Sequence, residues 1–261
     1  MSTRHHKNNR VRKKTFISVW RHFLDAHPEY LARHYWWAYL WRFGVWFFDH
    51  QPIINAILFG QYQVLKTQAL RACMVDRPKG RLLQLTCVYG SLTPSLIKSM
   101  KGDDLYLMDV ADVQLDATRQ KLNDKEKTRL LSARMNAEHL AYCNDAFSTI
   151  LMFFLLHELP PAAREHTLGE ALRVLQPGGR LVITEYGQYS RQHFLCRWRL
   201  MRILLLHLEP FLDDFWHQNL FSVLSNHAKK YNKTLRKVDE FHCFSRFYRV
   251  CVFEVDNRDG T

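Results

Sequence analysis

The chain has 261 residues, enough for one large domain with extensions that buries its core without disulfide support. With 47% hydrophobic and 24% charged residues, the composition excludes wholesale disorder and collagen-like structure. The 37 basic and 25 acidic residues give a formal net charge of +12, which indicates an anionic partner, either nucleic acid or a membrane surface.

The N-terminal segment is strongly basic. Residues 1–14 contain six Lys or Arg, two His and no acidic residue. Such a run is typical of a disordered arm that is attracted to phosphate groups or anionic lipid. The alternative is a tail that only keeps the chain in solution.

Residues 15–78 are predicted to form a helical, aromatic-rich segment. The apolar runs at 36–41, 45–48 and 53–59 are separated by charged residues and a proline. None of them reaches the roughly 18–20 apolar residues that a transmembrane helix needs. Helices rich in Trp and Phe fit the headgroup layer of a membrane, and they also fit a cap that packs on the core. One segment can serve both purposes.

Residues 79–256 show alternating strands and helices. Predicted strands cover residues 81–87, 105–108, 130–135, 147–154 and 181–184, and predicted helices cover 93–100, 113–122 and 161–175. This alternation predicts an α/β, Rossmann-like domain whose mostly parallel sheet has helices on both faces. Two further strands, near 234–240 and 247–255, would add an antiparallel edge.

A basic amphipathic helical insertion is predicted near residues 190–225. Arginines alternate there with Leu, Ile, Phe and Trp, which suits a membrane surface or a lid over an apolar pocket. Glu209, Asp213 and Asp214 follow the basic part. They could complete a metal site, but surface charge is the preferred interpretation.

Ligands of an open parallel sheet bind outside the carboxyl ends of its strands. Asp109 ends the second predicted strand, where a carboxylate can accept hydrogen bonds from both hydroxyls of a ribose. We expect this side chain to be exposed rather than packed. A helix cap or a surface acid is the alternative for a single residue of this kind.

The order of these features resembles the class I S-adenosylmethionine-dependent methyltransferases, with the spacing of the family that includes the ubiquinone and menaquinone methyltransferases. The resemblance covers residues 80–186 and includes the Gly turn, the acid at strand two and the Pro-Gly-Gly before strand five. It implies that Asp109 holds the ribose, that Val110 flanks the adenine, and that Asn136 and Ala137 line the adenine end. The full set of implied cofactor-binding residues is Cys87, Val88, Tyr89, Gly90, Asp109, Val110, Gln114, Asn136, Ala137 and Phe154.

The first turn departs from this family. Where an acid and three alternating glycines are usual, residues 84–90 read Gln-Leu-Thr-Cys-Val-Tyr-Gly. Glycines let the backbone approach a cofactor closely, so Tyr89 should shift the cofactor or narrow the site that holds it. The site is then either degenerate or repurposed.

Three segments look like the rhodoquinone-biosynthesis protein of the same superfamily. They are residues 85–93, 153–160 and 208–216. The resemblance implies that S-adenosylmethionine is an amino donor, that an amine replaces a ring methoxy group of ubiquinone, and that a divalent metal such as manganese assists. The chain departs from the pattern at Ser91, where Asp is expected, and at residues 243–248, which lack a Gly-containing aromatic motif.

Four residues at the ends of the fourth and fifth strands are candidates for catalysis. His157 can act as a general base near neutral pH, and Glu158 can bind a hard divalent metal, although a His-Glu pair is also common at a helix start. Glu185 is a second candidate metal ligand or could orient the amine. Tyr186 could stack on a quinone ring.

The leading hypothesis is an S-adenosylmethionine-using enzyme that transfers an amino group to a polyprenyl quinone at an anionic membrane surface. Its expected location is peripheral, on the cytoplasmic face of a bacterial inner membrane or the matrix side of a mitochondrial one. The alternatives are a conventional methyltransferase acting on a quinone or lipid, and an accessory protein with a decayed cofactor site. Nucleic acid does not fit, because the basic residues alternate with apolar ones rather than with a polar reading face.

Overall fold

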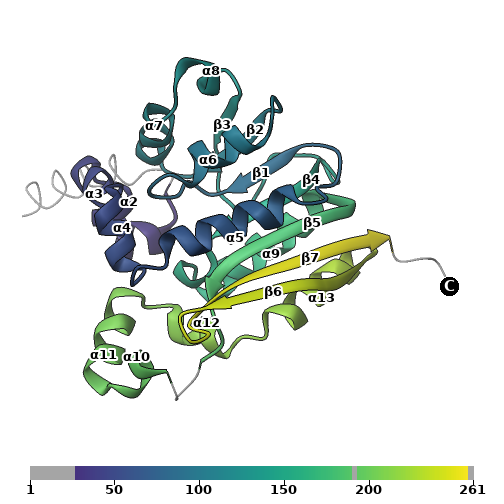
Figure 1. The fold of residues 1–261 in the computed structure, drawn as a ribbon. Helices are drawn as coiled ribbons and strands as arrows, with labels where there is room; N and C mark the ends of the chain where they lie inside the picture. Colours follow the sequence, from purple (N-terminus) through teal and green to yellow (C-terminus); the bar gives the residue numbers. More distant parts are fainter. Residues whose placement is uncertain (1–26, 190–192, 258–261) are drawn as a thin grey trace, which may run out of the picture.

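The computed structural model of the chain describes residues 27–189 and 193–257 (Figure 1). The predicted basic arm at 1–14 and the first part of the aromatic segment lie outside the described residues. Within the described part, no helix is both long enough and apolar enough to cross a membrane.

One seven-stranded sheet forms the centre of the molecule, in the order β3-β2-β1-β4-β5-β7-β6. Its strands are β1 (Leu82–Leu85), β2 (Leu105–Asp109), β3 (Leu130–Arg134), β4 (Phe147–Phe153), β5 (Leu175–Tyr186), β6 (Lys233–Cys243) and β7 (Tyr248–Asn257). The first five strands pair in parallel, and β7 pairs antiparallel with both β5 and β6. The predicted α/β architecture with an antiparallel edge is therefore confirmed.

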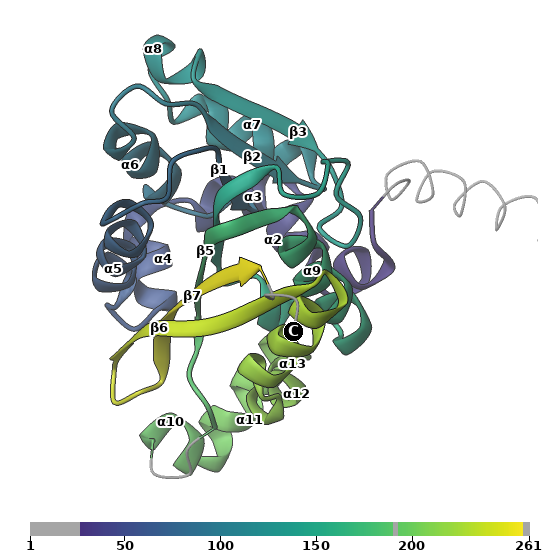
Figure 2. The same ribbon diagram turned by 90° about the vertical axis from the view of Figure 1, so that its right-hand side faces the viewer.

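Helices cover both faces of this sheet. On one face lie α5 (Tyr62–Met74) and α6 (Leu92–Ser99), and on the other lie α9 (Pro161–Val174) and α13 (Leu220–Lys230) (Figure 2). Two further helices, α7 (Asp112–Gln120) and the short α8 (Asp124–Lys127), connect β2 to β3. The sheet therefore has the two-sided cover expected of βαβ units.

The Pro-Gly-Gly segment does not separate helix from strand as expected. Helix α9 ends at Val174, and β5 begins at the next residue and runs through the three residues. The pairing of β4 with β5 shifts register between Phe147 and Thr149, which accommodates the extra residues as a bulge. Gly178 adopts a φ of +73° there, a conformation that favours glycine.

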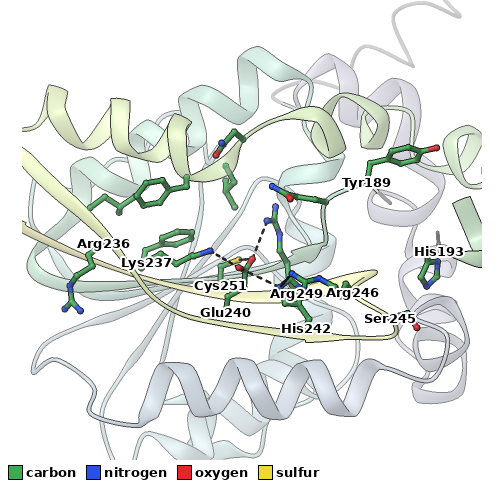
Figure 3. Close-up of a pocket in the computed structure, with 16 residues that line it drawn as sticks. Tyr189, His193, Arg236, Lys237, Glu240, His242, Ser245, Arg246, Arg249 and Cys251 are labelled. Carbon is green, nitrogen blue, oxygen red and sulfur yellow. Dashed lines mark hydrogen bonds and ion pairs between the residues drawn. The ribbon is translucent and has the colours of Figure 1, made fainter. Parts of the chain in front are cut away.

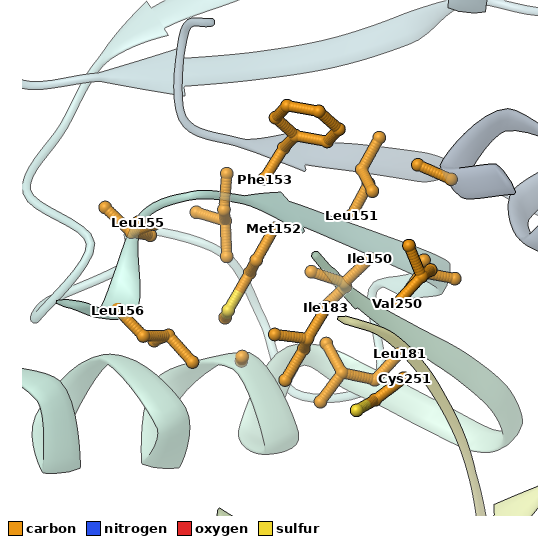
Figure 4. Packing of buried hydrophobic residues seen from close by; sticks show 14 of the residues in the cluster. Ile150, Leu151, Met152, Phe153, Leu155, Leu156, Leu181, Ile183, Val250 and Cys251 are labelled. Atoms are coloured by element: carbon orange, nitrogen blue, oxygen red, sulfur yellow. The ribbon is translucent and has the colours of Figure 1, made fainter. Parts of the chain in front are cut away.

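The core lies along β4, whose seven residues are all buried (Figure 4). Ile150 and Met152 pack with Leu181 and Ile183 of β5 above α9. Because both faces of β4 are covered by helices, the side chains from Ile150 to Phe153 are apolar in succession rather than in alternation.

Two helical segments lie outside the sheet and its covering helices. Residues 28–59, here called the N-terminal cap, contain η1 (Leu31–Tyr35), α2 (Trp36–Tyr39), α3 (Arg42–Phe48) and α4 (Gln51–Ile57). The predicted insertion contains α10 (Phe194–Arg197), α11 (Arg199–Leu208) and α12 (Leu212–His217). Figure 1 shows the cap on the side to which the carboxyl end of β1 points.

Candidate functional site

The turn after β1 lies beneath the N-terminal cap. The hydroxyl of Tyr89 donates a hydrogen bond of 2.6 Å to the carbonyl oxygen of Ala38 and accepts one of 3.0 Å from the amide of Gln114. The rings of Tyr89 and Tyr39 are stacked, with centroids 5.7 Å apart and planes within 9°. The aromatic residue that replaces a glycine of the family pattern is thus held by three groups of the protein.

The backbone of the same turn is fixed by residues far away in the sequence. The carboxylate of Asp49 accepts a hydrogen bond of 2.7 Å from Gly90 N, and the ammonium of Lys121 lies 2.8 Å from the same oxygen. Lys121 also donates to the carbonyl oxygens of Val88 and Gly90. A Cβ at Gly90 would lie 2.6 Å from the hydroxyl of Tyr62, and φ at this position is +77°, so only glycine fits.

Asp109 is where the sequence predicts it, at the end of β2, but it is not exposed. The residue is 7% exposed, and its two carboxylate oxygens accept hydrogen bonds from Cys87 N at 2.9 Å and Ala111 N at 2.8 Å. Burial raises the pKa of Asp109 to about 6, although these backbone donors act to lower it. The expectation of an exposed acid is wrong, because the carboxylate also connects the first turn to the second strand.

The predicted adenine end is covered by the cap. Val110 and Ala111 pack against Leu31, Tyr35 and Leu40 in a small apolar cluster. In this structure the cap therefore covers the apolar surface that the adenine ring would contact.

The amide of Asn136 faces Glu138 rather than open space. Its oxygen accepts a hydrogen bond of 3.0 Å from Glu138 N, and its nitrogen lies 3.3 Å from the carboxylate of Glu138. That carboxylate also accepts a hydrogen bond of 3.4 Å from the hydroxyl of Tyr30, while Ala137 is buried in the core.

The residues at the end of β2 still fit a nucleoside cofactor in their chemistry. A carboxylate offers about four acceptor positions, and at Asp109 a ribose hydroxyl would compete for them with the donors of Cys87, Val110 and Ala111. Val110 offers the apolar surface that an adenine ring requires. The ring of Tyr39, however, covers the face of Tyr89 in the first turn and would compete with the cofactor for that surface.

Shortening Tyr39 to alanine is therefore expected to tighten S-adenosylmethionine binding by about two- to tenfold. The stack of Tyr39 on Tyr89 contributes about 0.5–1.5 kcal/mol, and in the alanine variant this stack would no longer oppose the entry of S-adenosylmethionine. Isothermal calorimetry measures the change. Tyr39→Phe keeps the ring and should match the parent protein, as should Trp41→Ala on the exposed side of the cap. Weaker binding by the Tyr39→Ala variant alone would show that Tyr39 forms part of the cofactor-binding surface rather than covering it.

A buried cluster of charged residues surrounds His157 in the short helix η2 (Leu156–Glu158). Its Nδ1 lies 2.9 Å from Glu185 Oε2, and its Nε2 lies 3.7 Å from Glu209 Oε2 and 4.0 Å from Glu158 Oε1. The cap contributes two hydroxyls to this cluster. Tyr35 donates to Glu209 at 3.2 Å, and Tyr39 donates to Glu158.

Glu185 is saturated by hydrogen bonds and is not placed as a metal ligand. Its carboxylate accepts from Leu156 N, His157 N and Tyr186 N as well as from the His157 ring. Across residues 27–189 and 193–257, no group of three or more His, Cys, Asp or Glu side chains is arranged to hold a metal ion. The predicted ligands Glu158 and Glu185 therefore do not form a fitting site for manganese.

The protonation states of the cluster differ from those expected. Burial alone lowers the pKa of His157, but Glu185, Glu209 and Glu158 together raise it to about 9. Burial raises the pKa of both Glu158 and Glu209, against the opposing effect of the His157 charge. The raised pKa favours a protonated His157 ring at neutral pH, which disfavours its predicted role as general base. The neighbouring Glu158, whose pKa burial raises to about 8, can accept a proton once it has ionised.

Tyr186 and Phe154 belong to an aromatic group of the protein. The Tyr186 ring is 4.8 Å from that of His157, 5.7 Å from Phe154 and 5.3 Å from Phe247. Tyr186 is only 6% exposed. Its ring supports His157 and has no free face for the predicted stacking on a quinone.

Sequence reasoning did not identify several residues that the structure brings to this site. Surface charge is the preferred interpretation for Glu209, Asp213 and Asp214, yet Glu209 lies 3.7 Å from His157 in the cluster, whereas Asp213 pairs with Arg202 at 3.4 Å. The match at residues 208–216 was the one signal for Glu209. Tyr39, Asp49 and Lys121 carry no such signal, since each acts through a contact at long sequence separation.

Comparison with known proteins identifies relatives for most of this region. A profile of the ubiE/COQ5 methyltransferase family matches residues 49–231. The chain is 32% identical over 132 residues to the ubiquinone/menaquinone biosynthesis C-methyltransferase UbiE of Proteus mirabilis, a match covering 50% of this chain and 51% of that protein. It is 26% identical over 189 residues to the demethylmenaquinone methyltransferase of Lactiplantibacillus plantarum, covering 71% and 78%. The chain thus spans about half the length of the Proteus relative.

Solved structures share the fold. The N-methyltransferase NodS of Bradyrhizobium japonicum, in complex with S-adenosyl-L-homocysteine, superposes with a TM-score of 0.52 at 17% identity, covering 80% of this chain and 90% of NodS. The cyclase SpnF superposes with a TM-score of 0.56 at 15% identity, covering 81% and 95%. These likenesses confirm the predicted Rossmann-like class I methyltransferase fold.

Proposed function

The chain belongs to the ubiE/COQ5 methyltransferase family, and on that premise we propose that it transfers a group from S-adenosylmethionine to the ring of a polyprenyl quinone. Methyl transfer is the first candidate, because the named relatives are quinone C-methyltransferases. The observation that carries the proposal is Asp109, an acid at the end of β2 that contacts the first turn within the matched region.

The cluster around His157 suits chemistry on a quinol. When bound, S-adenosylmethionine supplies an electrophilic methyl group on a sulfonium. The Glu158 and Glu209 side chains are 16% and 22% exposed, so they are the members that a substrate can reach. A carboxylate with a raised pKa can accept the proton of a ring hydroxyl. The neighbouring His157 cation, held by Glu185, then stabilises the negative charge on that oxygen.

Amino transfer to ubiquinone, giving rhodoquinone, is the second candidate. The observation that favours it is Tyr89, whose ring and hydroxyl are fixed where the family pattern has glycine. A bulky side chain there supports a different presentation of the methionine part, with its amino group toward the substrate. The three segments that resemble the rhodoquinone-biosynthesis protein support the same reading.

The proposed site of action is the surface of an anionic membrane, with the cytoplasmic face of a bacterial inner membrane as the first location and the mitochondrial matrix side as the alternative. Two exposed apolar surfaces support this. In the cap, Trp41, Phe43 and Trp46 are 48–57% exposed, and in the insertion Leu200 is 82% and Ile203 56% exposed. Both surfaces lie on the side to which the carboxyl end of β1 points (left in Figure 1). A quinone tail could enter the bilayer there, and the net charge of +12 complements anionic headgroups.

Replacing Leu200 and Ile203 together by glutamine is expected to weaken partition to phosphatidylglycerol vesicles by about tenfold or more. Each substitution removes apolar area that would be buried in lipid, together about 2 kcal/mol. Vesicle co-sedimentation at two salt concentrations measures the effect. Val64→Gln with Leu131→Gln alters two side chains that are each 40% exposed on other elements, and should bind as the parent does. Equal loss of vesicle binding in both double variants would show that α11 is not the surface that contacts the membrane.

Calorimetric titration with S-adenosylmethionine tests the proposed function at its first step. Saturable binding is expected. No binding at millimolar cofactor would contradict the proposal and leave the accessory role, in which the chain binds a quinone without chemistry.

A further inference from the structure

A cavity lies apart from the residues around Asp109 and His157. It has a volume of about 930 Å³ and opens between the start of α13 and the β6–β7 hairpin (Figure 3). Neither Asp109 nor any member of the His157 cluster lines it. Arg249 joins the two regions, because it lies opposite Glu185 in the pairing of β7 with β5 and its Nε donates a hydrogen bond of 3.1 Å to the carbonyl oxygen of Tyr186.

Positive charge dominates the lining of this cavity. Four Lys or Arg residues and one acid, Glu240, line it; the four are Lys237, Arg246, Arg249 and Arg236, the last of which pairs with Glu254 at 2.7 Å. The carboxylate of Glu240 lies 2.8 Å from Lys237, 3.6 Å from Arg249 and 3.7 Å from His242 (Figure 3). One carboxylate therefore serves three basic side chains, and the cavity retains a surplus of positive charge.

Two basic side chains of the cavity, Arg246 and His242, are only partly paired within the described part of the chain. Arg246 has no ion-pair partner among the described residues, and its guanidinium contacts the His242 ring, with Nη2 3.3 Å from Nε2. The Nδ1 of His242 has no hydrogen-bond partner within the described part of the chain. Burial lowers the pKa of His242, and the charges of Arg246, Arg249 and Lys237 lower it further against the effect of Glu240. An anion would satisfy both side chains.

Apolar and aromatic side chains also line the cavity. They are Tyr189, Leu220, Phe221, Leu235 and Phe253. Phe221 is 44% exposed at the start of α13 and lies beside Phe253, with ring centroids 6.4 Å apart. A ligand of this cavity would therefore carry an anionic group next to a hydrophobic part.

We propose that this cavity is a binding site for a phosphate group carried by an amphipathic molecule. Guanidinium groups bind phosphate oxygens through paired, charge-assisted hydrogen bonds, and the two arginines nearest His242 supply such groups. The headgroup of an anionic phospholipid and a free phosphate ester share this chemistry. The site is independent of the proposed transfer reaction, since its residues take no part in it.

The test uses inorganic phosphate and the full chain. Phosphate should shift the His242 ring resonances in a saturable manner and raise the pKa of that ring, because an anion offsets the charges of Arg246, Arg249 and Lys237. The double variant Lys237→Gln, Arg246→Gln should bind phosphate at least about tenfold more weakly. The control Lys125→Gln, Lys230→Gln removes two charges from exposed positions elsewhere and should bind as the parent does. Absence of a saturable shift, or equal weakening in both variants, would overturn the proposal.

Vesicles then distinguish the two sources of the phosphate. If a headgroup occupies the cavity, the Lys237, Arg246 variant should lose affinity for phosphatidylglycerol vesicles relative to the control, and inorganic phosphate should compete with the vesicles. If vesicle binding is unchanged while phosphate binding is lost, the ligand is a soluble phosphate ester. Cofactor binding, measured in parallel, should remain unchanged in both variants.

Discussion

Replacing Asp109 by alanine is expected to weaken S-adenosylmethionine binding by at least about a hundredfold. Charge-assisted hydrogen bonds to the two ribose hydroxyls are worth about 1.5–3 kcal/mol each, and both would be lost. The substitution should also destabilise the fold by about 1–3 kcal/mol for each of the two backbone N–H groups, of Cys87 and Ala111, that lose their acceptor. Calorimetry gives the affinity, and thermal denaturation shows whether the variant is folded at the temperature used.

The matched control for this result is Asp112→Ala. Asp112 begins α7 three residues later and pairs with Arg134 at 3.1 Å, with its side chain 61% exposed. Its loss should change the affinity by less than about twofold, in line with an exposed ion pair. The parent protein should lose affinity as the pH falls below about 6, because Asp109 then becomes protonated. An Asp109 variant that is folded and binds normally would remove the basis for the cofactor assignment.

Glu158→Gln is expected to lower turnover by about a hundredfold or more while cofactor affinity stays the same. Glutamine keeps the shape of the side chain but cannot accept the proton of a quinol hydroxyl, and general-base catalysis contributes about 10²–10⁴-fold. Steady-state kinetics with a quinone in vesicles measures the loss. Asp213→Asn, an acid on α12 that pairs with Arg202 rather than His157, should retain activity.

The same account predicts a loss of activity at alkaline pH. The pKa of His157 is raised to about 9, so the ring is cationic at neutral pH and loses its charge above that value. Turnover in the parent protein should rise as Glu158 ionises, because burial raises the pKa of that carboxyl to about 8, and should fall above about 9 as His157 loses its charge. If Glu158→Gln is fully active, or if turnover rises through pH 9, the cluster is structural and the proton must be removed elsewhere.

The sheet could be predicted from the sequence because its central strands are buried on both faces. The run at 147–154 is apolar except for Ser148 and Thr149 for this reason, and β4 occupies Phe147–Phe153. The course of residues 175–180 could not be predicted in the same way. Pro, Gly and Gly usually end an element, and only the partner strand, through its register shift at Phe147, shows that they form a bulge within β5.

The site was predictable only where one residue marks a strand end. Asp109 is found by that rule, but its contact with Cys87 N, in the turn after β1, is not. For Glu209 the sequence favours surface charge over a metal site, whereas contact with Tyr35 and His157 makes it part of the cluster. Contacts between the cap and the sheet join residues about 50 to 170 positions apart, and no local pattern encodes them.

One incubation tests the central claim, that a group passes from S-adenosylmethionine to a quinone, most directly. The cofactor is labelled with ¹³C in its methyl group and ¹⁵N in its amino group and is supplied with demethylmenaquinone or ubiquinone in phosphatidylglycerol vesicles. Mass spectrometry of the extracted quinones should find ¹³C on the ring for methyl transfer, the first candidate, and ¹⁵N on the ring for amino transfer, the second. Quinones that carry neither label, recovered with a protein that binds the cofactor saturably, would contradict the account.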